Sequence, residues 1–352
     1  MEYLLIFVIL LAGELLYFRV ADHFNIIDKP NERSSHTRIT LRGGGIIFYV
    51  GALLYFFMHG FEYPWFMLGL TLIALISFVD DVHSVSQKPR LAVHFIAMLL
   101  MFYQWGLFTQ FPLWYILIAL VCCTGIINAY NFMDGINGIT GGYSLVVLSA
   151  LAYINCRCVQ FIEPDFLYVV MSAVAVFCFF NFRKRAKCFA GDVGSVSIAF
   201  IILFVLGKLI LETDDLTYII LLAVYGVDSV LTIIHRLLLH ENISLPHRKH
   251  LYQIMANELR VPHVVVSLVY MIVQIAVIAG FLWLGGWHVY YLFGILLVLS
   301  GCYVIFMRRY FHLHLENKSL SIFAPFASFL FLFTTNLINT HTHTFFVAGG
   351  HP

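Results

Sequence analysis

The segment ISFVDDVHSVSQKPR, residues 76–90, joins two apolar runs through a short polar stretch. The first run ends in two adjacent aspartates, Asp80 and Asp81, and the second begins after Lys88 and Arg90. An apolar run of about 20 residues is long enough to cross a bilayer as a helix. The segment therefore predicts a helix, a short loop and a second helix, with two carboxylates at the end of a membrane span. Ionisable groups at such a depth are costly and usually functional.

The composition of the whole chain is that of a membrane protein. Its 352 residues are 61% hydrophobic and only 11% charged, whereas soluble domains are about half apolar and about a quarter charged. The net charge of +1 is uninformative, because in a membrane protein the position of the charges matters more than their sum. The seven cysteines follow no spacing typical of a metal site or a disulfide framework.

The apolar runs predict an all-α, polytopic integral membrane protein of about eleven transmembrane helices. A further segment at 320–338 is apolar but broken by Pro325, and the sequence leaves open whether it spans. We expect one domain over residues 1–352, with a motif-bearing part at about 25–260 and C-terminal spans over 261–352. The predicted helices lie at residues 3–20, 44–60, 64–80, 91–108, 111–129, 139–156, 166–182, 194–212, 216–235, 263–284 and 288–307.

The basic residues gather in alternate loops, which predicts the orientation of the chain. Lysine and arginine cluster at 19–42, 88–90, 183–187, 236–260 and 308–309, while the intervening loops are nearly bare. The positive-inside rule places the basic loops in the cytoplasm and the N-terminus outside. No basic residue precedes the first apolar run, so we expect it to be retained as a helix and not removed as a secretory signal.

The conspicuous polar motifs all fall on the loops of this predicted cytoplasmic side, at residues 27–45, 80–81, 128–142, 188–195 and 240–253. Carboxylates together with substrate phosphates usually hold Mg²⁺. Glycines allow a phosphate to approach the backbone, and arginines and lysines bind phosphate oxygens. This combination favours phosphoryl transfer at the edge of a bilayer, with a lipid phosphate as one substrate.

Each motif taken alone also fits a structural role. The aspartate pair fits a helix cap, Asp134-Gly135 and Asn137-Gly138 fit ordinary turns, and Ser195 fits a cap position. A lone His250 is a weak signal in a chain with 16 histidines. It is the joint occurrence of the motifs on one side that favours a single composite active site.

The motifs resemble those of the polyprenyl-phosphate N-acetylhexosamine-1-phosphate transferases. This family, glycosyltransferase family 4, includes undecaprenyl-phosphate GlcNAc-1-phosphate transferases and phospho-N-acetylmuramoyl-pentapeptide transferases. The motifs that carry the resemblance are DKPNERSSH at 28–36, VDD at 79–81, NAYNFMDGINGITGG at 128–142 and FAGDVGS at 189–195.

The resemblance implies the activity, cofactor and partners. An N-acetylhexosamine-1-phosphate would pass from a UDP-sugar to undecaprenyl phosphate with release of UMP, as the initiating step of O-antigen, capsule or other cell-envelope polysaccharide synthesis. The cofactor would be Mg²⁺, with Mn²⁺ as the alternative. The enzyme would lie in the bacterial inner membrane among membrane lipid, with its active site facing the cytoplasm. We expect no nucleic-acid partner and consider a homodimer.

The same resemblance assigns roles to residues matched by position. Asp192 would ligate the metal, the aspartate pair would handle the lipid phosphate with one member as general base, and Phe189 would stack on uracil. The catalytic set would be Asp80, Asp81, Asp134 and His250, and the substrate-binding set Lys88, Asn128, Asn131, Asn137, Phe189 and Arg248.

Two departures from the family pattern bear on the sugar. Asn137 stands where most members have a second aspartate, and the last motif reads HRKHLYQ at 247–253 where the GlcNAc and muramoyl-pentapeptide branches have a histidine cluster. Tyr252 and Gln253 replace the later histidines. The HRKHLYQ form resembles that of the branch which starts O-antigen or capsule chains with less common sugars, so the resemblance implies a 6-deoxy or otherwise modified amino sugar in preference to GlcNAc.

Two other function classes stay open at this point. A transporter of an anionic substrate would also hold polar groups in the membrane, although it would carry broken helices and often a repeat. An inactive homologue that acts as an assembly scaffold would fit the altered Asn137 and histidine motif. The sequence leaves undecided the sugar, the pathway, the oligomeric state and which of Asp80 and Asp81 is the base.

Overall fold

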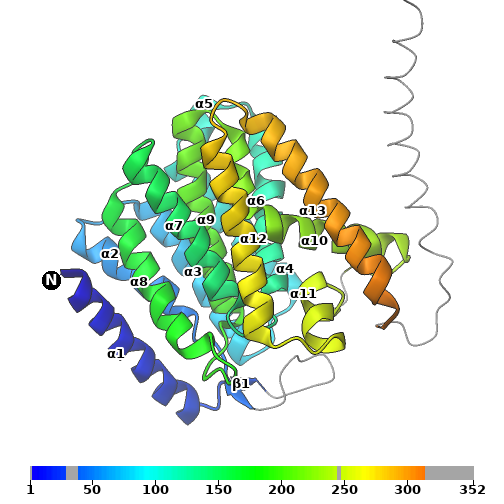
Figure 1. Cartoon of the computed structure of the whole chain (residues 1–352). Coiled ribbons are helices and arrows are strands. Elements are labelled where there is room, and N and C mark those ends of the chain that lie inside the picture. The colour runs from blue at the N-terminus through cyan, green and yellow to red at the C-terminus, as the bar shows by residue number, and fades with distance from the viewer. Residues whose placement is uncertain (1, 29–38, 244–246, 314–352) are drawn as a thin grey trace, which may run out of the picture.

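The computed structural model describes residues 2–28, 39–243 and 247–313, and these residues form a bundle of helices (Figure 1). Turns of 3-10 or π geometry at Leu216–Leu222, Ile254–Glu258 and Phe311–Leu313 join or extend the helices. The α-helices are α1 (Glu2–His23), α2 (Ile46–Met58), α3 (Pro64–Val82), α4 (Gln87–Gln104), α5 (Leu107–Gln110), α6 (Leu113–Met133), α7 (Ile139–Arg157), α8 (Pro164–Asn181), α9 (Gly191–Thr213), α10 (Ala223–Leu238), α11 (Leu251–Gln253), α12 (His263–Trp283) and α13 (His288–Tyr310).

The all-α membrane fold predicted from the apolar runs is confirmed, and each predicted run corresponds to a helix. Within the described residues, nine helices are long and apolar enough to span a bilayer. Helix α2 has 13 residues and is too short for that criterion. Helix α4 falls below it because its first turn is polar, with Gln87, Lys88 and Arg90. The segment 320–338 lies outside the described residues.

Helix α9 forms the centre of the bundle. In the most apolar stretch of α9, 83% of the residues are buried. The corresponding share is 6% in the span His288–Leu313, which contains α13. Helix α9 packs against α2, α3, α6 and α7, and in Figure 1 it runs through the middle with α1 and α13 on opposite outer sides. A helix that is apolar on all faces is expected in such a position. The start of α9 is therefore held from several sides.

Close backbone contact places the loop before α2 against the start of α9. A Cβ atom added to Gly45 would lie 2.3 Å from the Gly194 Cα, so both positions need a residue without a side chain. The same loop pairs with the segment before α9 in a strand-like manner. The Phe189 amide donates to the Leu41 carbonyl at 2.8 Å, and the Gly44 amide donates to the Phe189 carbonyl at 2.9 Å.

The motif loops meet at one end of the bundle, as their predicted sidedness requires. The small antiparallel hairpin of β1 (Ile27–Asp28) and β2 (Thr40–Leu41) lies there. Figure 1 shows β1 and α11 at the lower end and α5 at the opposite end. The Asn137 Nδ2 donates to the Arg183 carbonyl at 3.0 Å, and the Tyr252 hydroxyl donates to the Phe132 carbonyl at 2.8 Å. Loops distant in sequence are thereby joined.

Candidate active site

The second aspartate of the pair, Asp81, caps the start of α9. Its Oδ1 accepts from the Asp192 amide and its Oδ2 from the Val193 amide, both at 2.9 Å. The first amides of a helix have no partner within the helix, and a carboxylate there also meets the positive end of the helix dipole. Gly191 has φ +71°, and a Cβ at this position would lie 2.4 Å from the Asp81 Oδ2. A glycine is therefore required for the carboxylate to reach the helix.

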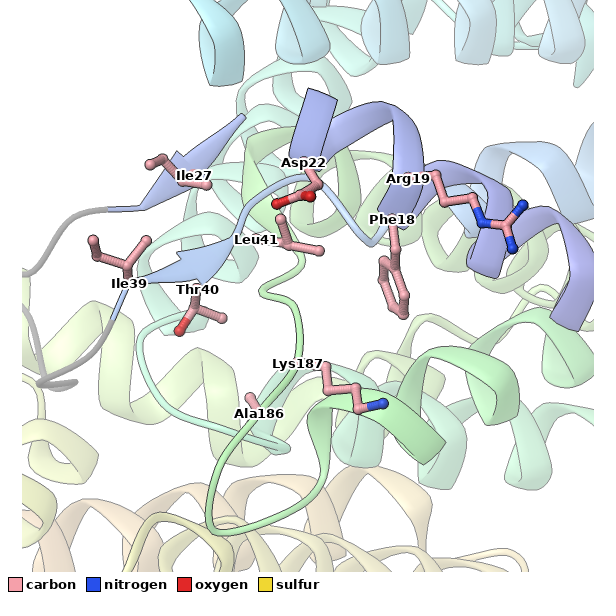
Figure 2. Close-up of a pocket in the computed structure, with 9 residues that line it drawn as sticks. All are labelled: Phe18, Arg19, Asp22, Ile27, Ile39, Thr40, Leu41, Ala186 and Lys187. Atoms are coloured by element: carbon pink, nitrogen blue, oxygen red, sulfur yellow. The ribbon is translucent and has the colours of Figure 1, made fainter. Parts of the chain in front are cut away.

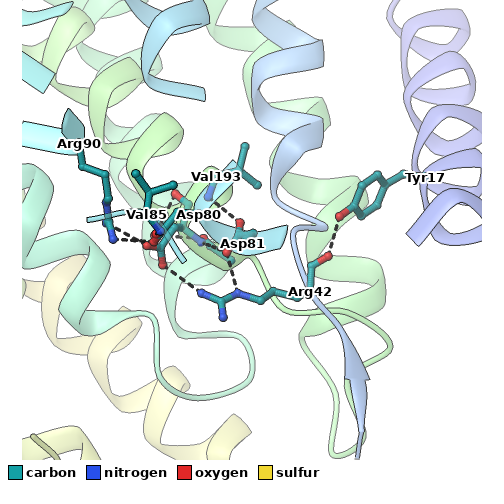
Figure 3. Close-up of polar contacts among 10 residues, drawn as sticks. Tyr17, Arg42, Asp80, Asp81, Val85, Arg90 and Val193 are labelled. Carbon is teal, nitrogen blue, oxygen red and sulfur yellow. Dashed lines mark hydrogen bonds and ion pairs between the residues drawn. The ribbon is translucent and has the colours of Figure 1, made fainter. Parts of the chain in front are cut away.

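Two arginines bridge three carboxylates in what we call the Asp–Arg cluster, defined as Arg42, Asp80, Asp81, Arg90 and Asp192 (Figure 3). The Arg42 Nε lies 2.6 Å from the Asp81 Oδ1, and its Nη2 lies 3.4 Å from the Asp192 Oδ1. The Arg90 Nη1 lies 2.5 Å from the Asp80 Oδ2, and its Nη2 lies 2.9 Å from the Asp192 Oδ2. Asp192 thus sits between the two guanidinium groups.

The two adjacent aspartates of α3 have different surroundings. The Asp81 side chain is fully buried with both oxygens occupied. Asp80 remains 10% exposed, accepts from the Val85 amide at 2.7 Å, and lies within hydrogen-bonding reach of the Asp192 carboxyl group. Asp192 is 18% exposed. Asp80 and Asp192 are therefore the carboxylates of the cluster that a ligand can approach.

The donor set of the cluster fits a magnesium ion shared with a substrate. Three carboxylates face two guanidinium groups, which leaves one negative charge in excess when all are ionised. Among the described residues no group of three or more His, Cys, Asp or Glu side chains is arranged to enclose a metal. Mg²⁺ commonly takes one or two carboxylates and completes its shell with phosphate oxygens and water. Asp192, which is 18% exposed and lies between the two guanidinium groups, matches that requirement.

Asp134 follows α6 and lies near the cluster. Its Oδ1 accepts from the Thr140 hydroxyl at 2.7 Å. Burial raises the pKa of Asp134 to about 7, the Thr140 hydrogen bond opposes this, and the charges of Asp192 and Asp81 add to it. Such a carboxyl group changes its protonation near neutral pH, a property often found in groups that take part in proton transfer. The prediction that Asp134 belongs to the site is thus compatible with its position.

The HRKHLYQ segment, residues 247–253, packs against the end of α6. The His250 side chain is buried, with its ring centroid 6.2 Å from that of Phe132. Burial and the neighbouring His250, Arg236 and Lys249 lower the pKa of His247 to about 3, so this ring is neutral. The side chains of Tyr252 and Gln253 turn inward: the former donates to the Phe132 carbonyl, and the latter accepts from the His250 amide at 3.3 Å.

The remaining asparagines predicted to bind substrate lie in three different environments. Asn137 is buried, and its amide donates to the carbonyls of Arg183 and Lys184, so its side chain joins two loops. Asn128 is exposed on α6. The Asn131 Nδ2 is buried without a hydrogen-bond partner among the described residues. Of the three, Asn131 offers a donor to a ligand, and the binding roles of all three stay predictions.

The other predicted substrate residues surround the cluster more loosely. Lys88 is exposed at the start of α4, while Phe189 and Arg248 are half-buried. The structure thus pairs Asp80 with Arg90, whereas sequence analysis assigned Lys88 to the site. Sequence analysis used Arg90 only as a marker of sidedness. Lys88 and Arg90 lie in the same loop on the predicted cytoplasmic side, two residues apart. The sequence alone offers no means of deciding which of them contacts an aspartate.

Sequence analysis also missed Asn181, a buried residue at the end of α8. Its Oδ1 accepts from the Gly138 amide at 2.7 Å, and its Nδ2 donates to the Cys188 carbonyl at 2.8 Å. It therefore ties the loop after α6 to the loop before α9. An asparagine that ends an apolar helix, next to the basic run 183–187, was the signal that could have found it.

A cavity of about 560 Å³ lies beside the site and is bordered by α1, the β1–β2 hairpin and the loop after α8 (Figure 2). None of the Asp–Arg cluster residues lines it, although Leu41 directly precedes Arg42 in the chain. Its lining combines apolar side chains with both charge signs, and consists of Phe18, Arg19, Asp22, Ile27, Ile39, Thr40, Leu41, Ala186 and Lys187.

Comparison with known proteins gives consistent matches. A family model described as glycosyl transferase family 4 matches residues 63–209, which include Asp80, Asp81, Asp134 and Asp192. The chain is 27% identical over 254 residues to the probable undecaprenyl-phosphate N-acetylglucosaminyl 1-phosphate transferase of Bacillus subtilis (strain 168), covering 66% of this chain and 70% of that protein.

Two enterobacterial proteins, both named undecaprenyl-phosphate alpha-N-acetylglucosaminyl 1-phosphate transferase, match at a similar level. The Yersinia pestis protein is 27% identical over 224 residues, covering 58% of this chain and 61% of the relative. The Escherichia coli (strain K12) protein is 26% identical over 278 residues, covering 71% of this chain and 75% of the relative. The family resemblance inferred from the motifs is confirmed by these matches.

Proposed function

We propose that this chain, which matches the family model of glycosyl transferase family 4 over residues 63–209, transfers an N-acetylhexosamine-1-phosphate from a UDP-sugar to undecaprenyl phosphate and releases UMP. The relatives named above are sugar-1-phosphate transferases that act on undecaprenyl phosphate. The observation that carries the proposal is the Asp–Arg cluster, which unites an acidic helix end, the start of α9 and two arginines in one place. Phosphoryl transfer depends mainly on such positioning and charge.

In the proposed reaction the acceptor is an oxygen of the lipid phosphate. It forms a new bond to the phosphorus that carries the sugar, and the bond from this phosphorus to the oxygen shared with the uridine monophosphate breaks. UMP leaves with that oxygen, and a lipid pyrophosphoryl sugar remains. Any proton still held by the lipid phosphate passes to a carboxylate. A phosphate monoester has a second pKa near 6, so much of the acceptor already lacks this proton at neutral pH.

Asp80 suits the role of proton acceptor better than Asp81. Both oxygens of Asp81 are engaged by the α9 amides and Arg42, and its side chain is fully buried. Asp80 is partly exposed and shares Arg90 with Asp192. We therefore assign proton removal to Asp80 and the construction of the site to Asp81. Arg42 and Arg90 would meet phosphate oxygens when a substrate displaces their carboxylate contacts.

Asp192 would hold Mg²⁺ or Mn²⁺, with phosphate oxygens and water completing the shell of the ion. The ion would neutralise charge on the diphosphate oxygens when bound. Asn131, with its unpartnered buried amide, would donate to the nucleotide sugar, and Phe189 would stack on the uracil. The inward orientation of Tyr252 and Gln253 supports a sugar pocket unlike that of the histidine-rich branches, so we propose a modified amino sugar such as a 6-deoxyhexosamine as the preferred donor.

We also infer that the protein lies in the bacterial inner membrane with this end of the bundle facing the cytoplasm. The basic loops at 183–187 and 247–260 lie at this end, and basic loops favour the cytoplasmic side. Tags near residues 86 and 248 should then be cytoplasmic and a tag near 160 external. Periplasmic labelling of a cysteine placed at Gln87 would overturn this orientation.

The proposed function is tested with the purified protein, undecaprenyl phosphate, Mg²⁺ and a panel of radiolabelled UDP-sugars that includes UDP-GlcNAc and its 6-deoxy analogue. We expect label in the extracted lipid and one UMP released for each sugar transferred. The Asp192→Asn variant is the inactive control. Transfer confined to UDP-GlcNAc would refute the sugar preference only. No transfer from any sugar would refute the activity and would favour the alternatives of an assembly scaffold or a transporter.

A further inference from the structure

A buried aspartate in the middle of α10 lies outside the motifs that sequence analysis used. The Asp228 side chain is 4% exposed and the facing His250 side chain is 2% exposed. A buried carboxylate is costly unless it is paired and hydrogen-bonded. Packing alone therefore does not account for Asp228, and the groups that contact its carboxylate bear on its role.

The partners of Asp228 come from two other segments as well as its own helix. Its Oδ1 lies 3.4 Å from the His250 Nδ1, and accepts from the Leu251 amide at 3.0 Å and the Thr232 hydroxyl at 3.1 Å. Its Oδ2 accepts from the Tyr270 hydroxyl at 2.6 Å. One oxygen thus faces both the ring of His250 and the backbone that follows it, which places the carboxylate beside the Nδ1 side of the imidazole.

The opposite nitrogen of this ring is left without a partner. The His250 Nδ1 faces Asp228 at 3.4 Å without hydrogen-bond geometry, and the Nε2 is buried and makes no hydrogen bond among the described residues. The ring lies between aromatic neighbours, with centroid distances of 4.9 Å to His247 and 6.2 Å to Phe132. Phe132 is two residues before Asp134 in the motif at the end of α6. A buried nitrogen without a partner needs an explanation such as a catalytic role, a ligand or a bound water, and this one stands beside a site motif.

We propose that Asp228 is the positioning residue for His250, holding a proton on Nδ1 so that Nε2 is presented to the diphosphate of the sugar donor. A neutral imidazole has one donor and one acceptor nitrogen, and the group facing Nδ1 decides which is which. When His250 takes a second proton, Nε2 becomes a donor to a phosphate oxygen, and the Asp228 carboxylate offsets the charge of the ring. The part concerning the diphosphate rests on the proposed function.

The decisive experiment is a double-mutant cycle of Asp228→Asn and His250→Gln, with kcat and KM measured for sugar transfer. Loss of an orienting partner typically costs about 10- to 100-fold. We expect Asp228→Asn to lower kcat by that factor when His250 is present, and by less than about twofold in the His250→Gln background. An equal loss in both backgrounds would show that Asp228 only anchors the chain at Leu251, and would overturn the proposal.

A matched control removes a different partner of the same carboxylate. Tyr270→Phe deletes the donor to Oδ2 and leaves the His250 side untouched, so we expect a lower melting temperature with kcat within about threefold of the parent protein. A loss of kcat equal to that of Asp228→Asn would contradict a role through His250.

A spectroscopic measurement separates this inference from the proposed function. In protein labelled with ¹⁵N-histidine, the His250 signals are assigned by their disappearance in His250→Gln. We expect a protonated Nδ1 in the parent protein and a shift of the proton to Nε2 in Asp228→Asn. This result needs no substrate, so it holds or fails whether or not any UDP-sugar is used. Unchanged nitrogen shifts in Asp228→Asn would refute the proposal.

Discussion

The Asp–Arg cluster and the Asp228–His250 pair lie at the same end of the bundle, but they compensate their charges differently. The cluster has three carboxylates against two guanidinium groups and remains partly exposed, with the Arg42 side chain 33% accessible. The Asp228–His250 pair is enclosed, with side chains 4% and 2% exposed, and its carboxylate is satisfied mostly by neutral donors. An open, undercompensated cluster can exchange its partners for a metal and phosphates. A closed pair can only orient.

This difference predicts that substitutions in the cluster act mainly on turnover, and most strongly at Asp192. Asp192→Asn removes the carboxylate that we propose as the metal ligand and leaves Arg42 and Arg90 without their shared negative charge. We expect transfer to fall by about 10³-fold or more, measured as label in extracted lipid over a range of Mg²⁺. Asp22→Asn, at an exposed position lining the neighbouring cavity, is the matched control and should retain activity. Near-normal turnover of Asp192→Asn at low Mg²⁺ would contradict the assignment.

Within the cluster, Asp81 should behave like a buried structural group. Asp81→Asn replaces one charged acceptor of the α9 amides and leaves the Arg42 guanidinium short of a partner. Because the Asp81 carboxylate is fully buried and caps two α9 amides, we expect a clear fall in melting temperature in detergent together with loss of activity at every pH. If Asp81→Asn melts like the parent protein, the capping of α9 by this carboxylate is not what holds the site.

Asp80→Asn should show the opposite profile. Because asparagine keeps an acceptor oxygen for the Val85 amide, and Asp80 accepts from no amide of α9, we expect a smaller fall in melting temperature than Asp81→Asn causes. General-base contributions are typically about 10²–10⁴-fold, and turnover should fall within that range at pH 6. It should recover as pH rises, because the lipid phosphate then loses its proton to water. A flat pH profile with weakened UDP-sugar binding would assign Asp80 to the nucleotide.

The pKa of Asp134 gives a pH-dependent expectation for stability. Burial raises it to about 7, helped by Asp192 and Asp81 and opposed by the Thr140 hydrogen bond and Arg42. The folded protein therefore binds this proton more tightly than the unfolded chain does, so the contribution of Asp134 to stability is present below about pH 4 and is lost as pH rises through about 7. In EDTA, Asp134→Asn should melt increasingly close to, or above, the parent protein as pH is raised from 5 to 8. If the difference in melting temperature between Asp134→Asn and the parent protein stayed constant from pH 5 to 8, the raised pKa of Asp134 would be contradicted.

Much of the fold could be predicted from the sequence because bilayer thickness dictates helix length. Lysine and arginine gather in alternate loops, and this pattern predicted that the motifs lie at one end of the bundle. The division between Asp80 and Asp81 did not follow. Neighbouring residues on a helix point in different directions, and what each meets depends on α9, whose Asp192 amide is 111 residues away from Asp81. Likewise the inward orientation of Tyr252 depends on the Phe132 carbonyl, 120 residues distant. Motif spacing contains no information about such contacts.

The smallest expected effect belongs to Lys88, and it tests the boundary of the cluster. Lys88 is exposed, and an exposed charge contact contributes only up to about 1 kcal/mol. We expect Lys88→Gln to raise the KM for the lipid phosphate by about three- to sixfold, with kcat nearly unchanged and no change in melting temperature. Lys184→Gln, in the exposed part of another basic loop, is the matched control and should leave KM unchanged. Arg90→Gln should be far more damaging, because it separates Asp80 from Asp192. Equal losses for Lys88→Gln and Arg90→Gln would mean that the cluster has Lys88 as a member when substrate is bound, and its border would have to be redrawn to include the start of α4.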